Sequence, residues 1–356
     1  MTNRKHWILS IAFIAMALWL VPAGSEGAPA TGPLQALYEA AKAEGEVSFW
    51  GPTDPDEMIP LAAGFNKRFP GIKVKPFEIT SGQLVQRIVT EAQAGKFSAD
   101  SAEGSVGTIT PLLERDLIQG YNDWVKLFQG PGLQLNPNSI VMDGRCVTWY
   151  NLAHPIAYNT NLLKREEVPK TWEDILDPKW RGGKILLEAR AKAFAYLGLK
   201  WGEQKTMDYV RRLVAQKPIF SKGGTATIQQ LAAGEAPLAI GTYAYKVMWY
   251  ARDKKAPIDF VDTTNPMGAS HFVSYALKGA KHPHAAKLFI GWLSTPEALK
   301  ILADVSFKGP LIPGSDTIEY KRFKKNNIEF IMESPDTVKI STELEKKSSE
   351  LLGAIR

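Results

Sequence analysis

The stretch EGEVSFWGPTDPDEMIPLAAGFNKRFPGIKVKPFEI, residues 44–79, decides the fold. It begins with a short apolar strand over residues 46–50 and ends with a second predicted strand over residues 72–79. The segment between them has one apolar face at helical spacing, formed by Leu61, Ala62, Phe65 and Phe69. A strand, a helix and a second strand in succession predict an α/β fold with a mainly parallel sheet.

Residues at both ends of this helix signal where it begins and where it stops. We expect Asp54 to be the N-cap and Pro55 the first helical residue, because proline tolerates that position. Glu57 is placed to complete a capping box with Asp54. Pro70 and Gly71 then end the helix.

The same alternation continues along the chain. Gly82 opens another helical pattern, and a second α/β series begins near Tyr158. That series includes predicted strands over residues 184–187 and 237–240, with helical patterns between them. No internal repeat or low-complexity linker interrupts it.

The N-terminus has the order of a secretory signal. Arg4 and Lys5 precede an apolar run of 14 residues, 8–21, and small residues follow it. A retained membrane anchor is the alternative, although a spanning helix needs about 20 residues. We expect residues 1–30 to be a cleaved signal peptide and the mature protein to be periplasmic. With no cysteine near the cleavage region, we expect no lipid anchor.

Composition limits the classes of function. About 330 residues remain after cleavage, enough for two domains, and 45% hydrophobic content supports a packed core. The net charge is +6, but basic and acidic residues are interspersed, so we expect no nucleic-acid partner. Cys146 is the only cysteine, which excludes an intramolecular disulfide.

Four blocks together resemble a known family. They are YEAAKAEGEVSFWGPTDPDEM with its continuation to Asp100, IAYNTNLLKREEVPKTWEDILDPKWRGGKI (156–185), GGTATIQQLAAGEAPLAIG (223–241) and KHPHAAKLFIGWLSTPEALKIL (281–302). The chain is similar to type II periplasmic solute-binding proteins of ABC transporters, in the iron(III)-binding-like branch.

The resemblance implies a two-lobed architecture with hinge crossover strands between the lobes. Residues 31–153 and 267–356 would form lobe 1, and residues 154–266 would form lobe 2 inserted into it. A small-molecule ligand would bind in the cleft, and an ABC-transporter permease in the membrane would be the protein partner. We expect a monomer.

The first candidate ligand contacts lie at helix starts. Gly223, Gly224 and Thr225 precede a helical pattern, where free backbone N–H groups and the helix dipole favour an anion. The alternative is an ordinary turn in which Thr225 caps its own helix. In lobe 1, Ser81 and Gly82 also lie at a predicted helix start. That start is expected at the carboxyl edge of the sheet, where ligands of open α/β sheets bind, so both residues are candidate contacts.

Three further candidates each have an alternative. Thr53 is a contact candidate in the loop after the first strand, beside Asp54, which is the more natural cap. Tyr158 lies beside the predicted hinge and is either a ligand contact or a packed aromatic. Arg190 follows a strand and either pairs with a carboxylate or phosphate or is a solvated surface residue.

Tyr243 and Tyr245 are the last two candidates. Iron-binding members of the resembled family use two adjacent tyrosines in this region, together with a histidine in the first loop and an acid. Here Ala244 separates the tyrosines, and the first loop has no histidine. Residues two apart share a face on a strand and diverge on a helix, so convergence requires an extended backbone.

These observations predict a binding protein rather than an enzyme. The sequence has no GxSxG, HExxH, phosphate-loop or CxxC motif. His282 and His284 lack a third ligand at recognisable spacing, so we assign no metal site and no cofactor. The favoured ligand is a small organic anion: a carboxylate, phosphonate or phosphate ester. Ferric iron is the alternative, and a sensor-docking module and a cleft enzyme are further readings.

Overall fold

The computed structural model describes residues 32–190 and 192–353. The predicted signal peptide, residues 1–30, lies outside the described residues. Within the described ranges, every helix is too short or too polar to cross a bilayer.

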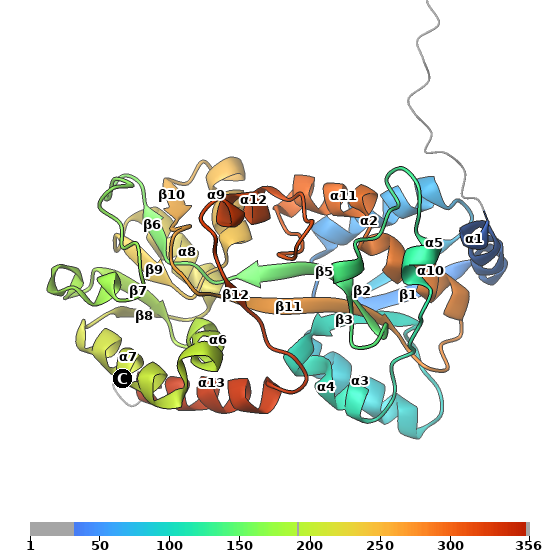
Figure 1. The fold of residues 1–356 in the computed structure, drawn as a ribbon, viewed down its shortest axis with the longest axis horizontal. Coiled ribbons are helices and arrows are strands. Elements are labelled where there is room, and N and C mark those ends of the chain that lie inside the picture. The colour runs from blue at the N-terminus through green and yellow to red at the C-terminus, as the bar shows by residue number, and fades with distance from the viewer. Residues whose placement is uncertain (1–31, 191, 354–356) are drawn as a thin grey trace, which may run out of the picture.

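The first sheet has the strand order β2-β1-β3-β11-β5-β4, and β12 pairs with β11 (Figure 1). β1 is parallel to β2 and β3, whereas β11 is antiparallel to β3 and β5. The strands are β1 (Glu46–Gly51), β2 (Lys73–Glu78), β3 (Ser101–Ser105), β4 (Ile140–Val141), β5 (Cys146–Ala153), β11 (Met267–Ala276) and β12 (Phe330–Ile331).

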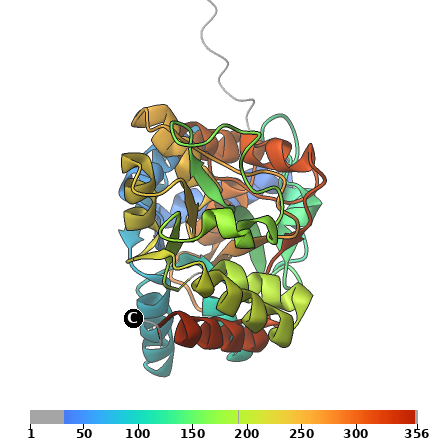
Figure 2. The same cartoon turned by 90° about the vertical axis from the view of Figure 1, so that its left-hand side faces the viewer.

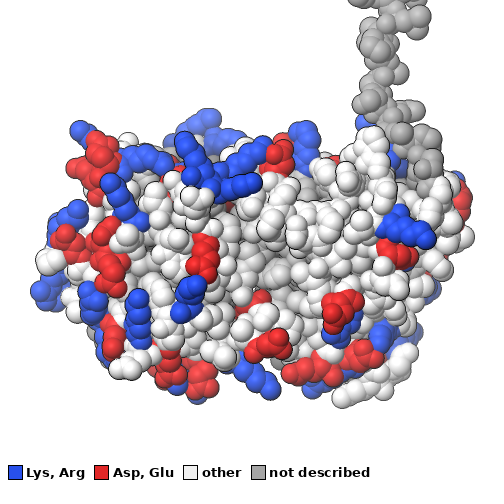
Figure 3. All heavy atoms as spheres, in the orientation of Figure 1, with Lys and Arg blue, Asp and Glu red and all other residues white. Residues whose placement is uncertain are grey.

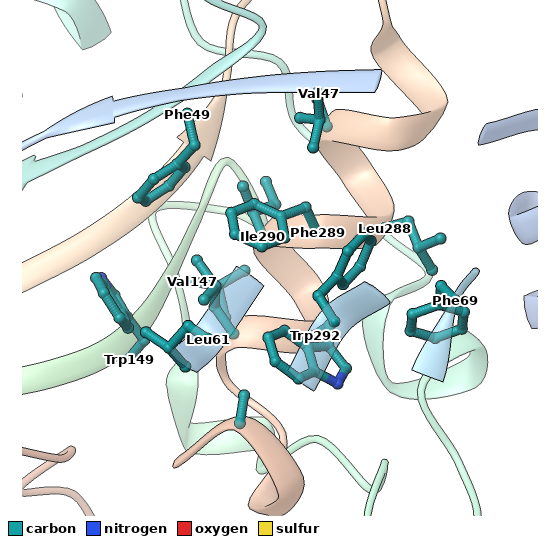
Figure 4. Close-up of a cluster of buried hydrophobic side chains, with 14 of the residues drawn as sticks. Val47, Phe49, Leu61, Phe69, Val147, Trp149, Leu288, Phe289, Ile290 and Trp292 are labelled. Carbon is teal, nitrogen blue, oxygen red and sulfur yellow. The ribbon is translucent and has the colours of Figure 1, made fainter. Parts of the chain in front are cut away.

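Helices cover both faces of this sheet. Val47 and Phe49 of β1 pack into one cluster, and Trp50 packs into the other, because successive strand residues point to opposite faces. Phe289 stands at the centre of the first cluster, 5.2 Å from the ring of Phe49 (Figure 4). The helices are α1 (Pro33–Glu44), α2 (Pro55–Arg68), α3 (Ser81–Gln93), α4 (Val106–Glu114), α5 (Trp124–Leu127), η1 (Pro137–Ser139), α10 (Pro283–Leu293) and α11 (Pro296–Ser306).

The second sheet has the strand order β10-β6-β9-β7-β8. β7 is parallel to β8 and β9, and β6 is antiparallel to β9 and β10. Its strands are β6 (Ala157–Asn159), β7 (Ile185–Glu188), β8 (Ile219–Ser221), β9 (Leu238–Ile240) and β10 (Ile258–Phe260). Its helices are α6 (Lys192–Trp201), α7 (Glu203–Ala215), α8 (Gly224–Ala233) and α9 (Ala244–Asp253), with short η2 (Asp174–Leu176) and η3 (Pro178–Trp180).

Two short connections join the sheets. The chain leaves the first sheet after Ala153, reaches β6 at Ala157, and returns from β10 to β11 at Met267. Figure 1 shows the two sheets side by side, with the long strands β5 and β11 running toward the second one. This arrangement confirms the predicted two-lobed α/β fold.

The C-terminal segment contacts both lobes. It consists of α12 (Ile318–Lys324), β12 and α13 (Val338–Gly353). Although the sequence assigns residues 267–356 to lobe 1, α13 packs mainly on α6 and α7 of lobe 2 and also touches α4 (Figure 2). On α12, Arg322 pairs with Asp259 and Asp262 of lobe 2, each at 2.7 Å.

The start of α2 differs from the predicted capping box. Asp54 is the N-cap and Pro55 opens the helix, but Asp54 makes no side-chain capping bond. Glu57 is buried and pairs with the Lys308 ammonium at 2.6 Å instead. The capping box is therefore wrong, because a buried carboxylate is stabilised more by a partner of opposite charge than by an exposed backbone N–H.

Charges of both signs are mixed over the face drawn in Figure 3, with few charged side chains across its middle. This mixture agrees with the interspersed charges of the sequence.

Candidate ligand-binding site

Two tyrosines meet where β9 passes into α9. Tyr243 is the N-cap of α9 and has an extended backbone, with φ −113° and ψ 141°, whereas Tyr245 lies inside the first turn. Their rings are stacked, with centroids 5.9 Å apart and planes 21° apart. The extended-to-helical junction brings the rings together, although the stretch is not the strand that convergence seemed to require. Burial raises the pKa of both phenols, so both are neutral in the free protein.

A small polar cavity adjoins Tyr243. It has a volume of about 70 Å³ and is lined by His154, Glu188, Arg190, Lys192, Gly224, Gly241 and Tyr243. The Arg190 guanidinium pairs with Glu188 at 3.0 Å, yet its side chain remains 73% exposed. Two basic residues and a helix start thus meet beside one phenol.

The start of α8 forms one wall of that cavity. Gly223 is the N-cap with φ 86°, a conformation that favours glycine. No side-chain hydrogen bond caps α8, and the first backbone N–H groups of a helix have no partner within it. Thr225 is not the cap that the sequence offered as an alternative, since it lies inside α8 and accepts a hydrogen bond from Lys246 at 2.9 Å.

His154 was missed by sequence reasoning. It is buried at the end of the crossover, and its ring lies 4.9 Å from that of Tyr243. Its Nε2 contacts the Ser270 hydroxyl at 2.9 Å, and burial lowers the pKa of His154 to about 3. The imidazole is therefore neutral and fixed behind the tyrosine. No sequence pattern distinguished His154.

Lobe 1 contributes a buried polar group centred on Glu103 of β3. The Thr53 N–H donates to Glu103 Oε1 at 2.8 Å, and the Tyr150 hydroxyl donates to Oε2 at 3.3 Å. Desolvation raises the pKa of Glu103 to about 7, against opposing hydrogen bonds from Thr53 and the charge of Lys308. A carboxylate inside the small-residue strand SAEGS was the signal that could have found this group.

Lys308 connects this group to the tyrosines. Its ammonium lies 5.1 Å from the centre of the Tyr150 ring and 5.0 Å from that of Tyr245. Tyr245 comes from lobe 2, so Lys308 joins the two walls of the cleft. Lys308 is buried, and the sequence did not distinguish it from the exposed lysines.

The candidate residues therefore divide into those that lie at the cleft and those that lie elsewhere. Arg190, Gly223, Gly224, Thr225, Tyr243 and Tyr245 gather on the lobe 2 wall, and Thr53 faces them from lobe 1 through Tyr150 and Lys308. Tyr158 lies in the lobe 2 core, and its hydroxyl donates to Asp259 at 3.4 Å. Ser81 and Gly82 open α3 at the lobe 1 sheet edge, and neither lines the cavity beside Tyr243.

Within the described ranges, no three His, Cys, Asp or Glu side chains are grouped closely enough to hold a metal ion.

Residues 61–328 match the family model of bacterial extracellular solute-binding proteins. The chain belongs to this family. This solute-binding protein is 28% identical to iron uptake protein A1 of Synechocystis over 264 residues, which cover 68% of this chain and 70% of the relative. It is 29% identical over 153 residues to an uncharacterised protein of Haemophilus influenzae, an alignment spanning 40% of this chain and only 43% of that relative.

Solved structures share the fold of this solute-binding protein. Iron-bound HitA from Pseudomonas aeruginosa superposes with a TM-score of 0.71 at 17% identity, covering 86% of this chain and 99% of that chain. Trichodesmium FutA in complex with iron and citrate gives 0.66 at 19% identity, covering 87% and 99%. At this identity the likeness establishes the fold alone.

Proposed function

We propose that the protein is the substrate-binding component of an ABC importer and that it captures ferric iron together with a small oxyanion between its lobes. The observation that carries the proposal is the pairing of Tyr243 with Tyr245 on the cleft wall. The iron-uptake names of the Synechocystis relatives and the iron in the solved structures support it. Ferric iron, the alternative reading of the sequence, thus becomes the favoured cargo.

The chemistry of the site fits a hard trivalent cation. Phenolate oxygens are hard anionic donors, and coordination replaces the phenol proton, so metal binding offsets the desolvation that keeps both tyrosines neutral. Two phenolates leave coordination positions open. An oxyanion seated beside Arg190 and the N-terminus of α8 would fill them and balance charge.

Delivery requires a shape that a permease can distinguish. A ligand bridging Tyr245 of lobe 2 and the Lys308 side of lobe 1 would favour the closed form over the open form. The protein would act after export to the periplasm and would perform no chemistry on its cargo.

A small organic anion bound without iron is the second candidate, and the cavity lined by Arg190, Lys192 and Gly224 favours it. One titration separates the two. The iron-stripped mature protein is titrated with ferric citrate and, separately, with citrate, while visible absorption and thermal unfolding are followed.

Ferric binding predicts a visible tyrosinate-to-iron charge-transfer band that is lost in Tyr243→Phe and in Tyr245→Phe and retained in Tyr121→Phe. Tyr121 is the matched control because it lies beside Lys287 on α10, away from the cleft. A colourless protein that is stabilised equally by citrate with and without iron would replace the iron proposal with the organic anion.

A further inference from the structure

A second, larger hollow lies between the lobes. Its volume is about 420 Å³, within the range of small-molecule pockets. One wall is the start of α2 and the end of α11 in lobe 1, and the other is α9 in lobe 2. The lining residues are Asp54, Pro55, Asp56, Glu57, Tyr245, Lys246, Trp249, Tyr250, Val305 and Ser306.

The lobe 2 wall is aromatic. Tyr245 and Trp249 are one turn apart on α9 and share one side of the helix, and Tyr250 also lines the hollow. Trp249 and Tyr250 meet edge to face at 5.3 Å. Ring faces attract cations, and Lys254 already lies 5.2 Å from the centre of the Trp249 ring.

The lobe 1 wall is acidic. Glu57 is neutralised by Lys308, but Asp54 and Asp56 are exposed and form no ion pair or side-chain hydrogen bond with the described residues. On the opposite wall, Lys246 is the one basic lining residue, and it donates to Thr225. Among the lining residues these two carboxylates face one ammonium, which gives the lining an excess of negative charge, while the Lys254 ammonium lies against the Trp249 ring outside the lining.

We propose that this hollow is a binding site for a small organic ammonium ion. The aromatic face of α9 would receive the cation, and Asp54 and Asp56 would supply the opposing charge from the other lobe. Because the two walls belong to different lobes, occupation would hold the lobes together. The hollow shares Tyr245 with the proposed iron site but is not lined by Tyr243, so its occupation by a cation is tested on the iron-free protein.

The test is isothermal titration of the iron-free mature protein with choline and with 3,3-dimethyl-1-butanol, its uncharged analogue of nearly equal shape. We expect choline to bind at least about tenfold more tightly than the alcohol. We also expect Asp54→Asn/Asp56→Asn to remove this preference. Asp54 makes no side-chain capping bond, so its replacement by asparagine removes no hydrogen bond from the start of α2.

The matched control is Glu203→Gln/Asp208→Asn, which removes two acids from α7 and should keep the preference for choline. Trp249→Leu should weaken choline binding while leaving Asp54 and Asp56 in place. Three results would each overturn the proposal. They are equal affinity for choline and the alcohol, no choline binding at millimolar concentration, and an undiminished preference for choline in Asp54→Asn/Asp56→Asn. Thermal unfolding of Asp54→Asn/Asp56→Asn, measured separately, reports whether this variant is folded.

Discussion

Replacing Glu103 with Gln should change how the stability of the protein depends on pH. Glu103 is fully buried, and desolvation raises the pKa of its carboxyl from 4.5 to about 7. Between these pH values the folded protein keeps a proton that the unfolded chain releases. The stability contributed by the neutral carboxyl is therefore present at low pH and is lost as pH rises toward 7.

The size of the effect follows from the width of that window. At about 1.4 kcal/mol per pH unit, the raised pKa of Glu103 makes the folded state about 3 kcal/mol less stable at pH 8 than at pH 4. Glutamine stays neutral, and its carbonyl oxygen can still accept from the Thr53 N–H. The free energy of unfolding of Glu103→Gln, relative to that of the natural protein, should rise by about 3 kcal/mol across this range.

Urea unfolding followed by tryptophan fluorescence from pH 4 to pH 8 measures this difference. Glu114→Gln, at the exposed end of α4, is the control and should differ from the natural protein by the same small amount at every pH. A difference for Glu103→Gln that stays constant between pH 4 and pH 8 would refute the reasoning that Glu103 holds its proton.

Three further outcomes follow from the contacts above. Iron affinity should fall as pH falls, by up to about a hundredfold per pH unit, because coordination releases a proton from each neutral phenol; a titration at pH 6 and pH 8 checks this, and equal affinities would contradict it. Lys308→Met should cost about 3–5 kcal/mol of unfolding free energy by leaving buried Glu57 unpaired, and adding Glu57→Gln should recover most of it; a double variant no better than the single one would contradict the pairing. Gly291→Ala should destabilise lobe 1 by about 1–3 kcal/mol in thermal unfolding, because its new Cβ would lie 2.2 Å from the Phe128 ring; an unchanged melting temperature would show that the ring can move away.

The fold could be predicted from the sequence because the apolar periodicity of single segments agrees with the architecture of the whole chain. The apolar periodicity of residues 44–79 predicted a strand, a helix and a strand, and the structure contains β1, α2 and β2 there. α2 buries one face, and β1 is a short apolar strand packed on both faces, so their patterns show directly in the sequence. The tail was less readable, since α13 is placed by packing on α6 and α7, which no local pattern specifies.

Only part of the candidate site could be predicted from the sequence. Gly223 and Gly224 signal a helix start, and the structure places one there. The approach of Tyr243 and Tyr245 depends on where α9 begins, and a shift of that boundary by one residue would change which way Tyr243 points. His154, Tyr150 and Lys308 come from distant strands and loops, so only tertiary structure brings them to the cleft.

The most direct test of iron capture is an anomalous difference map, recorded at the iron absorption edge, from crystals of the mature protein grown with ferric citrate. The account predicts one strong peak within bonding distance of the phenolate oxygens of both Tyr243 and Tyr245. A peak elsewhere, or no peak in crystals that contain bound citrate, would contradict it.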